Sequence, residues 1–257
     1  MMLFLYKQKR CQAGYTLVEL MVAVALTGIV TMSIYKSYIS VSTGYDVQDQ
    51  VIEVQQNARV AMDRMVKDIR TAGCSPHVSV DVTLPAFKTI EASEIRFARD
   101  ITGGAGSTTD HIDNDGDGIV DELDEDYLPD NDVNDPGEDV LYILEAGELK
   151  RANTAGGNKD SLIQNVDALR FIYYDENNAI TTVLGNVRTV QIALVVRASN
   201  EDYSFTDNRL YSIKDLTPAA NTVDILDAST LPSSQKYFRR QLLTAVVRCR
   251  NMWRWGS

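Results

Sequence analysis

Residues 14–35 form an apolar run that carries a single charged side chain, the carboxylate of Glu19. A run of about 20 apolar residues is long enough for a helix to cross a bilayer. A charge held deep in lipid costs roughly 2.5–3.5 kcal/mol on insertion scales, so such a charge usually has a partner and a function. The run predicts a membrane helix, and Glu19 is a candidate functional residue whose expected partner is an amine.

The residues around this run predict its orientation. Three basic residues and no acidic ones precede it: Lys7, Lys9 and Arg10. The positive-inside rule then keeps the N-terminus in the cytoplasm and sends the remainder across the inner membrane to the periplasm. The small residues Ala23 and Ala25 lie inside the run, whereas an ordinary secretory signal is cut after it. Any cleavage is therefore expected before the apolar segment, at Gly14.

The consecutive residues GYTLVEL, 14–20, resemble the leader junction of the type IV pilin family. The resemblance implies that a prepilin peptidase removes residues 1–14, cutting between Gly14 and Tyr15, and methylates the new amine. Residues 15–37 would remain as the membrane anchor and filament core, where Glu19 would pair with the N-terminal amine of a neighbouring subunit. Tyr15 departs from the family, in which Phe is commoner. The alternative is a plain single-span anchor with an incidental Glu.

The helix is predicted to continue as an amphipathic stem over residues 38–73. Apolar residues recur there at spacings of three and four: Val47, Val51, Val54, Ala58, Ala61, Met65, Ile69 and Ala72. Gly73 and Pro76 are the stop signal. The segment RMVKDIRTAG, 64–73, resembles the helix end of PilW-like minor pilins and of the related J pseudopilins of type II secretion. Lys36 stands where major pilins usually carry Pro, which favours the minor class.

Beyond Pro76 the apolar pattern changes to the alternation typical of strands. Strands are predicted at 78–84, 93–99, 139–145, 167–175, 186–198 and 237–250. Turns are expected at 145–148 and at Asn177 with Asn178. The predicted fold is α+β, with one long helix packed on an antiparallel sheet in a globular domain over residues 74–257. Three blocks, 161–175, 187–199 and 238–251, resemble PilW-like proteins in order, and this resemblance implies the type IV pilin fold.

Residues 103–139 are predicted to form an acidic insertion in that domain. The chain has a net charge of −11, and residues 110–139 hold 14 Asp or Glu and no Lys or Arg. Removing the three leader bases takes −11 to −14, so the insertion accounts for the whole net charge of the mature chain. The remainder is balanced, and no basic surface for nucleic acid is indicated.

Part of this insertion has the spacing of an EF-hand calcium loop. The expected Ca²⁺ ligands are five carboxylates and one backbone carbonyl: Asp113, Asp115, Asp117, Ile119, Asp121 and Asp124. Gly118 would allow the sharp turn that brings them together. Asp124 replaces the usual closing Glu, which makes the loop more similar to those of dockerins and thrombospondin-type repeats. Glu122 or Glu125 could instead serve as the closing ligand. A second fragment, 130–135, is less complete. The alternative is a solvated acidic loop that binds nothing specifically.

Three cysteines are present, and the predicted cleavage removes Cys11 with the leader. The remaining pair is Cys74 at the end of the stem and Cys249 in the last strand. An oxidising periplasm favours a disulfide between them. Closing so long a loop is worth about 4–5 kcal/mol on the chain-entropy model. The alternative is that both are buried thiols.

The sequence contains no motif of a serine hydrolase, a zinc protease or a P-loop enzyme, so we expect no catalysis. Two classes of function remain. The first is a minor pilin in the tip or initiating complex of a type IV pilus, with a J pseudopilin as its nearest variant. The second is a filament-displayed, calcium-dependent adhesin-like module. The expected partners are other minor and major pilins, the prepilin peptidase, the inner membrane and, at a filament tip, an adhesin.

Overall fold

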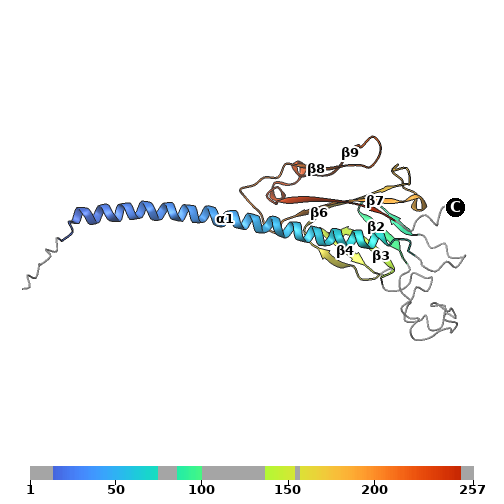
Figure 1. The fold of residues 1–257 in the computed structure, drawn as a ribbon, viewed down its shortest axis with the longest axis horizontal. Helices are drawn as coiled ribbons and strands as arrows, with labels where there is room; N and C mark the ends of the chain where they lie inside the picture. The colour runs from blue at the N-terminus through green and yellow to red at the C-terminus, as the bar shows by residue number, and fades with distance from the viewer. Residues whose placement is uncertain (1–13, 75–85, 100–136, 154–156, 250–257) are drawn as a thin grey trace, which may run out of the picture. The chain divides into compact units, whose positions relative to one another are not determined.

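The computed structural model describes residues 14–74, 86–99, 137–153 and 157–249. Its first element is a single helix, α1 (Leu17–Arg70), which runs without interruption through the apolar and amphipathic segments (Figure 1). The helix contains no Pro, and it ends before Gly73, which adopts a φ of 70°. The N–H of Gly73 donates to the carbonyl of Ala98 at 2.9 Å. The predicted helix over 15–73 is therefore confirmed, although it begins two residues later and ends three residues earlier than predicted.

The chain divides into two compact units, residues 1–49 and residues 50–257. In the second unit, one stripe of α1 is buried against the sheets, as the spacing of apolar residues predicts. Its buried apolar members are Val54, Ala58, Ala61, Met62, Met65 and Ile69, and Ala72, just beyond the helix end, is buried with them. Three of these seven are Ala, whose small side chain lets the strands approach the helix closely. Val51 is only partly buried, because it lies where the stripe begins.

Five strands form the first antiparallel sheet, in the order β1-β2-β3-β4-β5. Their bounds are β1 (Phe87–Ile90), β2 (Glu94–Ala98), β3 (Asp139–Glu145), β4 (Glu148–Ala152) and β5 (Asp160–Ile163). The predicted turn between β3 and β4 is confirmed. Ala146 and Gly147 both have positive φ, 52° and 77°, as a two-residue type I′ hairpin requires. The large side chains of Phe87, Phe97 and Tyr142 are fully buried in the core against α1.

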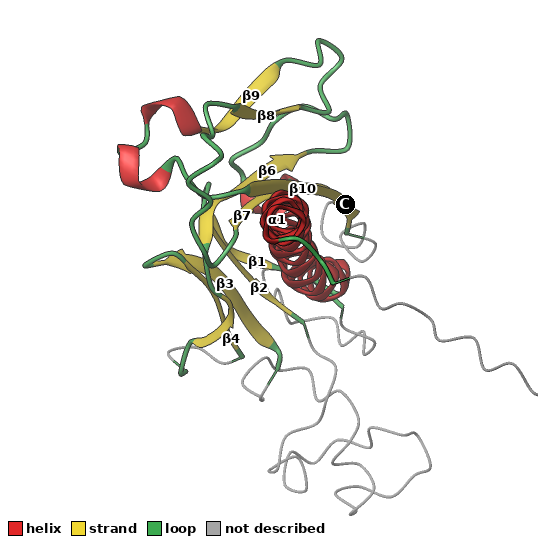
Figure 2. Cartoon of the chain, turned by 90° about the vertical axis from the view of Figure 1, so that its left-hand side faces the viewer, coloured by secondary structure: helices red, strands yellow, loops and turns green. Residues whose placement is uncertain are grey.

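The second sheet has the order β10-β7-β6. Its strands are β6 (Val166–Tyr174), β7 (Thr189–Arg197) and β10 (Arg240–Arg248). A hairpin of β8 (Leu210–Lys214) and β9 (Thr222–Asp227) lies over one face of this sheet, and α1 lies on the other (Figure 2). Eight of the nine residues of β7 are buried because both of its faces are covered. The described residues also include three short 3₁₀ helices: η3 (Leu184–Asn186), η4 (Ala228–Thr230) and η5 (Ser233–Gln235).

The sequence predicts one sheet, whereas the strands divide into two sheets and a separate hairpin. Five predicted strands are confirmed as β2, β3, β6, β7 and β10, and the α+β class is confirmed with them. The sequence does not predict the short strands β1, β5, β8 and β9, and β4 follows the predicted turn at 145–148. The turn at Asn178 is confirmed by its φ of 59°. The strand predicted at 78–84 lies outside the described residues.

Candidate functional site: the N-terminal helix and the base of the acidic insertion

The first turn of α1 begins at an N-cap residue, Thr16, a feature that the sequence analysis does not include. The side chain of Thr16, just before the helix, accepts a hydrogen bond from the backbone N–H of Glu19 at 3.2 Å. This bond satisfies one of the N–H groups that every helix start leaves without a partner. The pattern Thr-x-x-Glu at 16–19 could have revealed it. Glu19 thus occupies the third helical position, where the helix dipole favours a carboxylate.

The side chains of Tyr15 and Glu19 are both exposed, and Tyr15 is 87% exposed. Within the described part of the chain, the carboxylate of Glu19 makes no hydrogen bond and no ion pair. A carboxylate of this kind in an apolar helix can bind a cation supplied by another molecule, such as a protonated amine. Gly14 and Tyr15 directly precede the cap, so the predicted cleavage point lies one residue before Thr16.

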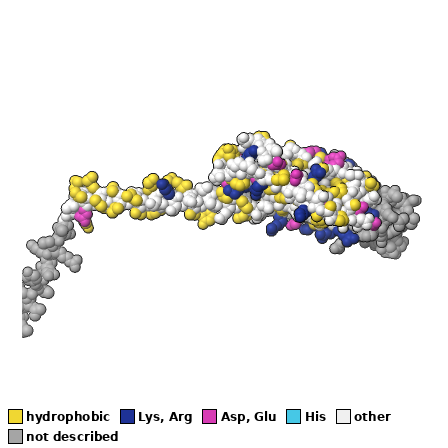
Figure 3. All heavy atoms as spheres, turned by 90° about the horizontal axis from the view of Figure 1, so that it is seen from above, with side chains coloured by type: hydrophobic (Ala, Val, Ile, Leu, Met, Phe, Trp, Pro, Cys, Tyr) yellow, Lys and Arg dark blue, Asp and Glu magenta, His cyan; other side chains and the backbone are white. Residues whose placement is uncertain are grey.

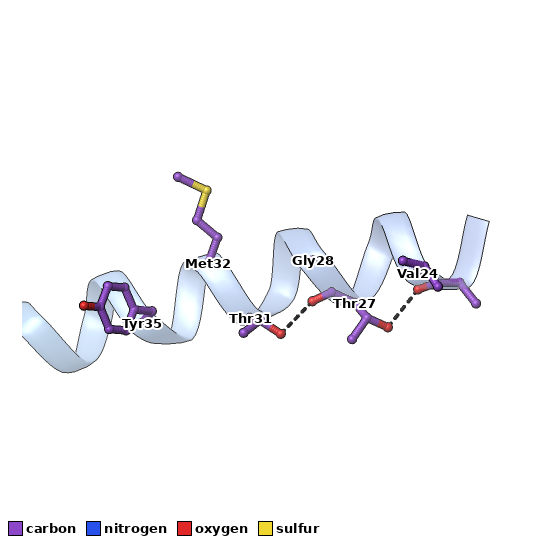
Figure 4. Close-up of a pocket in the computed structure, with 7 residues that line it drawn as sticks. Val24, Thr27, Gly28, Thr31, Met32 and Tyr35 are labelled. Atoms are coloured by element: carbon purple, nitrogen blue, oxygen red, sulfur yellow. Dashed lines mark hydrogen bonds between the residues drawn. The ribbon is translucent and has the colours of Figure 1, made fainter. Parts of the chain in front are cut away.

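By its length and composition, the apolar part of α1 could cross a membrane. None of that segment is buried against the rest of the chain. Hydrophobic side chains dominate its surface in Figure 3. Its hydroxyl groups bond to the helix backbone: Thr27 donates to Ala23 at 2.7 Å and Thr31 donates to Thr27 at 2.8 Å (Figure 4). These internal bonds reduce the cost of placing hydroxyls in lipid. Gly28 lies between them and leaves a shallow hollow on the helix.

At the other end of α1, Asp68 is the centre of a buried charge cluster. Its carboxylate accepts hydrogen bonds from the Tyr142 hydroxyl at 2.6 Å and from Arg151 Nε at 2.9 Å. Arg99 Nη1 lies 3.3 Å from its other oxygen, and Arg64 Nε forms a more exposed ion pair at 3.3 Å. Asp68, Arg99 and Arg151 are each at least nine-tenths buried. The cluster ties the end of the helix to β3 and β4.

Burial by itself raises the pKa of the Asp68 carboxyl. The Tyr142 hydrogen bond and the nearby guanidinium groups of Arg151, Arg99 and Arg64 outweigh that effect, so the pKa lies below its ordinary value. The sequence analysis does not include this cluster, because the partners of Asp68 lie far from it in the chain. The available signal was a lone Asp beside Ile69 in the apolar stripe.

Arg99, the last described residue before the acidic insertion, bonds to the residues at which the described chain resumes. Its backbone N–H donates to the Glu138 carbonyl at 2.9 Å, and its Nε donates to the Gly137 carbonyl at 2.8 Å. Its Nη1 bonds to the Thr71 hydroxyl of the helix end at 2.9 Å. Arg99 and Gly137 therefore lie close together, beside the end of α1. On the neighbouring strand, Asp139 is bound by Lys88 and Arg96 at 2.8 and 2.7 Å.

The predicted calcium ligands, 113–124, and the second acidic fragment at 130–135 lie outside the described residues. Within the four described segments, no group of three or more His, Cys, Asp or Glu side chains is arranged to hold a metal ion. The leader residues 1–13 also lie outside the described residues.

Cys249 is buried next to the last turn of α1, where its Sγ lies 3.7 Å from the Ile69 carbonyl oxygen. Burial raises the pKa of its thiol to about 12. Cys74 is partly buried and directly follows the residues that end the helix. The two cysteines therefore belong to the same region of the fold, but no disulfide joins them among the described residues. The disulfide predicted from the sequence stays a prediction.

Two family models match the chain. The model described as the prokaryotic N-terminal methylation motif matches residues 9–35, and the model of the type IV pilus-assembly protein W matches residues 127–251. Among curated proteins, none matches the sequence. A solved structure of a type IV-like pilin from Thermus thermophilus is similar with a TM-score of 0.42 and 14% identity. That likeness covers 77% of this chain and 97% of the other.

Proposed function

The chain is a PilW-like type IV pilin, a structural subunit, and from this premise we propose that it acts as a minor pilin in the complex that initiates or caps a type IV pilus. The observation that carries the proposal is that one chain matches both family models. The methylation motif covers the apolar helix, and the W model covers β3 through β10. A helix that anchors in the membrane and a rigid sheet domain provide what such a subunit needs, and neither requires a catalytic group.

We propose that processing occurs between Gly14 and Tyr15, in the inner membrane, with the globular unit in the periplasm. The new amine would then lie one residue before the Thr16 cap, close in sequence to Glu19. Because Glu19 has no internal partner in the described residues, its carboxylate can receive the N-terminal amine of a neighbouring pilin. This pairing would offset the cost of the carboxylate in lipid.

A J-type pseudopilin of a type II secretion system is the alternative to a pilus subunit. The location of the chain in the cell distinguishes a pseudopilin from a pilus subunit. A pilus subunit should be recovered in filaments sheared from the cell surface and identified by mass spectrometry. A chain that stays entirely in the envelope, in cells that lose type II secretion when it is deleted, would contradict the pilus assignment. An adhesin-like module remains a second proposal, and it depends on the calcium loop.

We propose that the loop from Asp113 to Asp124 binds Ca²⁺ in preference to Mg²⁺, because flexible carboxylates suit a large ion of high coordination number. A dissociation constant on the order of 10⁻⁴–10⁻³ M is adequate for an extracellular module. Millimolar Ca²⁺ should then raise the melting temperature of the protein relative to EDTA, by mass action. Replacing Asp113 and Asp117 with Asn should remove most of this shift.

The matched control for the calcium experiment is the double replacement of Asp130 and Asp132 with Asn. It removes the same charge from the same segment but leaves the ligand pattern intact, so the Ca²⁺ shift should persist. If the unaltered protein shows no shift, or if both double variants lose it equally, the acidic run is only a solvated segment.

We also propose that Cys74 and Cys249 become joined by a disulfide during export. The support is their shared position at the end of α1. The buried Cys249 thiol has a raised pKa, so little thiolate forms at neutral pH, and the bond should form during folding rather than afterwards. Peptide mapping of periplasmic material without reductant should find the linked peptides. Recovery of both residues as alkylated thiols would refute the bond.

A further inference from the structure

Three large apolar side chains are exposed in the segment that joins β6 to β7. They are Ile180, Val183 and Leu184, with exposed fractions of 53, 56 and 37%, and together they are called the apolar patch below. The same segment is anchored by Val187, which is fully buried in the core. Neighbouring apolar side chains that a fold holds at its surface often mark a place that another segment or molecule covers.

Hydrogen bonds hold the backbone around the apolar patch in place. The Thr181 N–H donates to the Tyr173 carbonyl of β6 at 2.9 Å. Just after the patch, Arg188 Nη1 donates to the Gly185 carbonyl of η3 at 2.7 Å. The patch is therefore presented by an ordered segment, and its exposure is a property of the fold.

Strand β10 ends at the same end of the second sheet as the apolar patch. Its last pair with β7 joins Arg248 to Thr189. Thr189 pairs in turn with Tyr174 of β6, and Tyr174 pairs with Ile180. Neighbouring strands lie about 4.8 Å apart, so three such spacings place Ile180 roughly 14 Å from the end of β10.

Residues 250–257, RNMWRWGS, follow β10 directly and lie outside the described residues. This segment contains Met252 and both Trp residues of the sequence, Trp253 and Trp255. Trp carries a large apolar surface that favours burial. The charges are also complementary, because the segment holds two Arg and no acidic residue, whereas the segment that leads to the patch carries the exposed carboxylate of Glu176.

The segment is long enough to reach the apolar patch. The Cys249 N–H donates to the Arg188 carbonyl at 2.9 Å, which fixes the point from which the segment starts. Four residues lead from Cys249 to Trp253, and four lead back from Arg188 to Leu184. A chain extends at most about 3.3–3.6 Å per residue, so each of these stretches spans about 14 Å or less. Trp253 can therefore lie directly over Leu184.

We propose that residues 252–255 dock on the apolar patch, so that the two Trp rings cover Val183 and Leu184. The occupant is a segment of this same chain because its attachment at Cys249 keeps it beside the patch at a high effective concentration. Docking closes the end of the second sheet at which β10 stops. The inference goes beyond the proposed function and does not depend on it, because it concerns contacts within one chain.

The test uses the fluorescence of Trp253 and Trp255 in the purified full-length chain in detergent. In the folded chain, the emission should lie at shorter wavelengths than in denaturant, and acrylamide should quench it less. Leu184→Ser removes an apolar side chain that the Trp rings would cover. It should lower the equilibrium constant for docking about tenfold or more, so that quenching approaches that of the unfolded chain.

Leu210→Ser is the matched control for Leu184→Ser. Leu210 is 53% exposed and follows Arg209, which bonds to the carbonyl of Arg240 at the opposite end of β10. This variant should quench like the unaltered chain, because it makes the same change away from the apolar patch. If Leu184→Ser is sensitive to protease, Val183→Ser carries the same test, since its more exposed side chain contributes less to folding.

Equal quenching of the folded and unfolded forms of the unaltered chain would overturn the docking. Protection that persists in Leu184→Ser and in Val183→Ser would place the Trp rings elsewhere, and an equal loss in Leu210→Ser would show that the effect is not specific to the patch. Either result would overturn the assignment of the patch. Protection that appears only as the protein concentration rises would overturn the choice of occupant in favour of a second copy of the chain.

Discussion

Replacing Asp68 with Asn is expected to lower the free energy of unfolding by about 3–5 kcal/mol, the usual cost of removing one partner from a buried ion pair. The substitution keeps the size of the side chain but leaves the guanidinium groups of Arg99 and Arg151 without their shared carboxylate. Both are at least nine-tenths buried, so water cannot replace it. The loss is measured by unfolding the full chain with denaturant in detergent, with the resistance of the sheet domain to trypsin as the readout.

Arg64→Ala is the matched control for Asp68→Asn. Arg64 contacts the same carboxylate, at 3.3 Å, but its side chain is 53% exposed. Pairs of this kind contribute roughly 0–1 kcal/mol, so this variant should be close to the unaltered chain. Equal losses in the two variants would mean that burial of the cluster is not what stabilises the helix end.

The same cluster predicts how stability depends on pH. Folding lowers the pKa of Asp68, so its carboxylate stabilises the fold at every pH above the unfolded value, about 3.9. That contribution is lost as the pH falls through the folded pKa. The unaltered chain should therefore lose stability in acid below about pH 4, and Asp68→Asn should show a smaller loss over that range.

Replacing Glu19 with Ala is expected to leave membrane insertion intact, or to improve it, because a costly charge is removed from the apolar helix. Incorporation into filaments should fall to background, because the neighbouring amine loses its carboxylate. The measurement is the ratio of this chain in sheared filaments to its amount in membranes. Normal incorporation of the Ala variant would show that the pairing is not required.

Glu19→Gln separates the charge of Glu19 from its place in the first turn of the helix. Gln can serve at the third helical position as Glu does, so the helix start should be preserved. If the charge is what matters, Gln should fail like Ala. If Gln incorporates normally, the role of residue 19 lies in forming the first turn, where Thr16 already bonds to its N–H.

The sequence predicts the long helix and the main strands because their signals are local. The stripe from Val54 to Ala72 has the period of a helix with one buried face, and β3 was predicted at its observed bounds. The short strands could not be predicted in this way. β8 and β9 become strands by pairing with each other over the second sheet, and β5 has only four residues, three of them exposed.

The division into two sheets also depends on contacts distant in sequence. The apolar run from Ile192 to Val196 in β7 indicates burial on both faces, but no local pattern shows that a hairpin covers the second face. The Asp68 cluster joins residues up to 83 positions apart, so its partners Tyr142 and Arg151 could not be assigned from the sequence. The Thr16 cap, by contrast, is a local pattern that could have been found.

The measurement that tests the central claim most directly is the N-terminus of this chain recovered from purified filaments. Mass spectrometry should find a mature chain that begins at Tyr15 and carries one methyl group on its amine. Such a result would unite the predicted cleavage, the methylation motif and filament assembly in one molecule. A chain that begins anywhere between Ala23 and Ser33, or that is absent from the filaments while abundant in the membrane, would contradict the account.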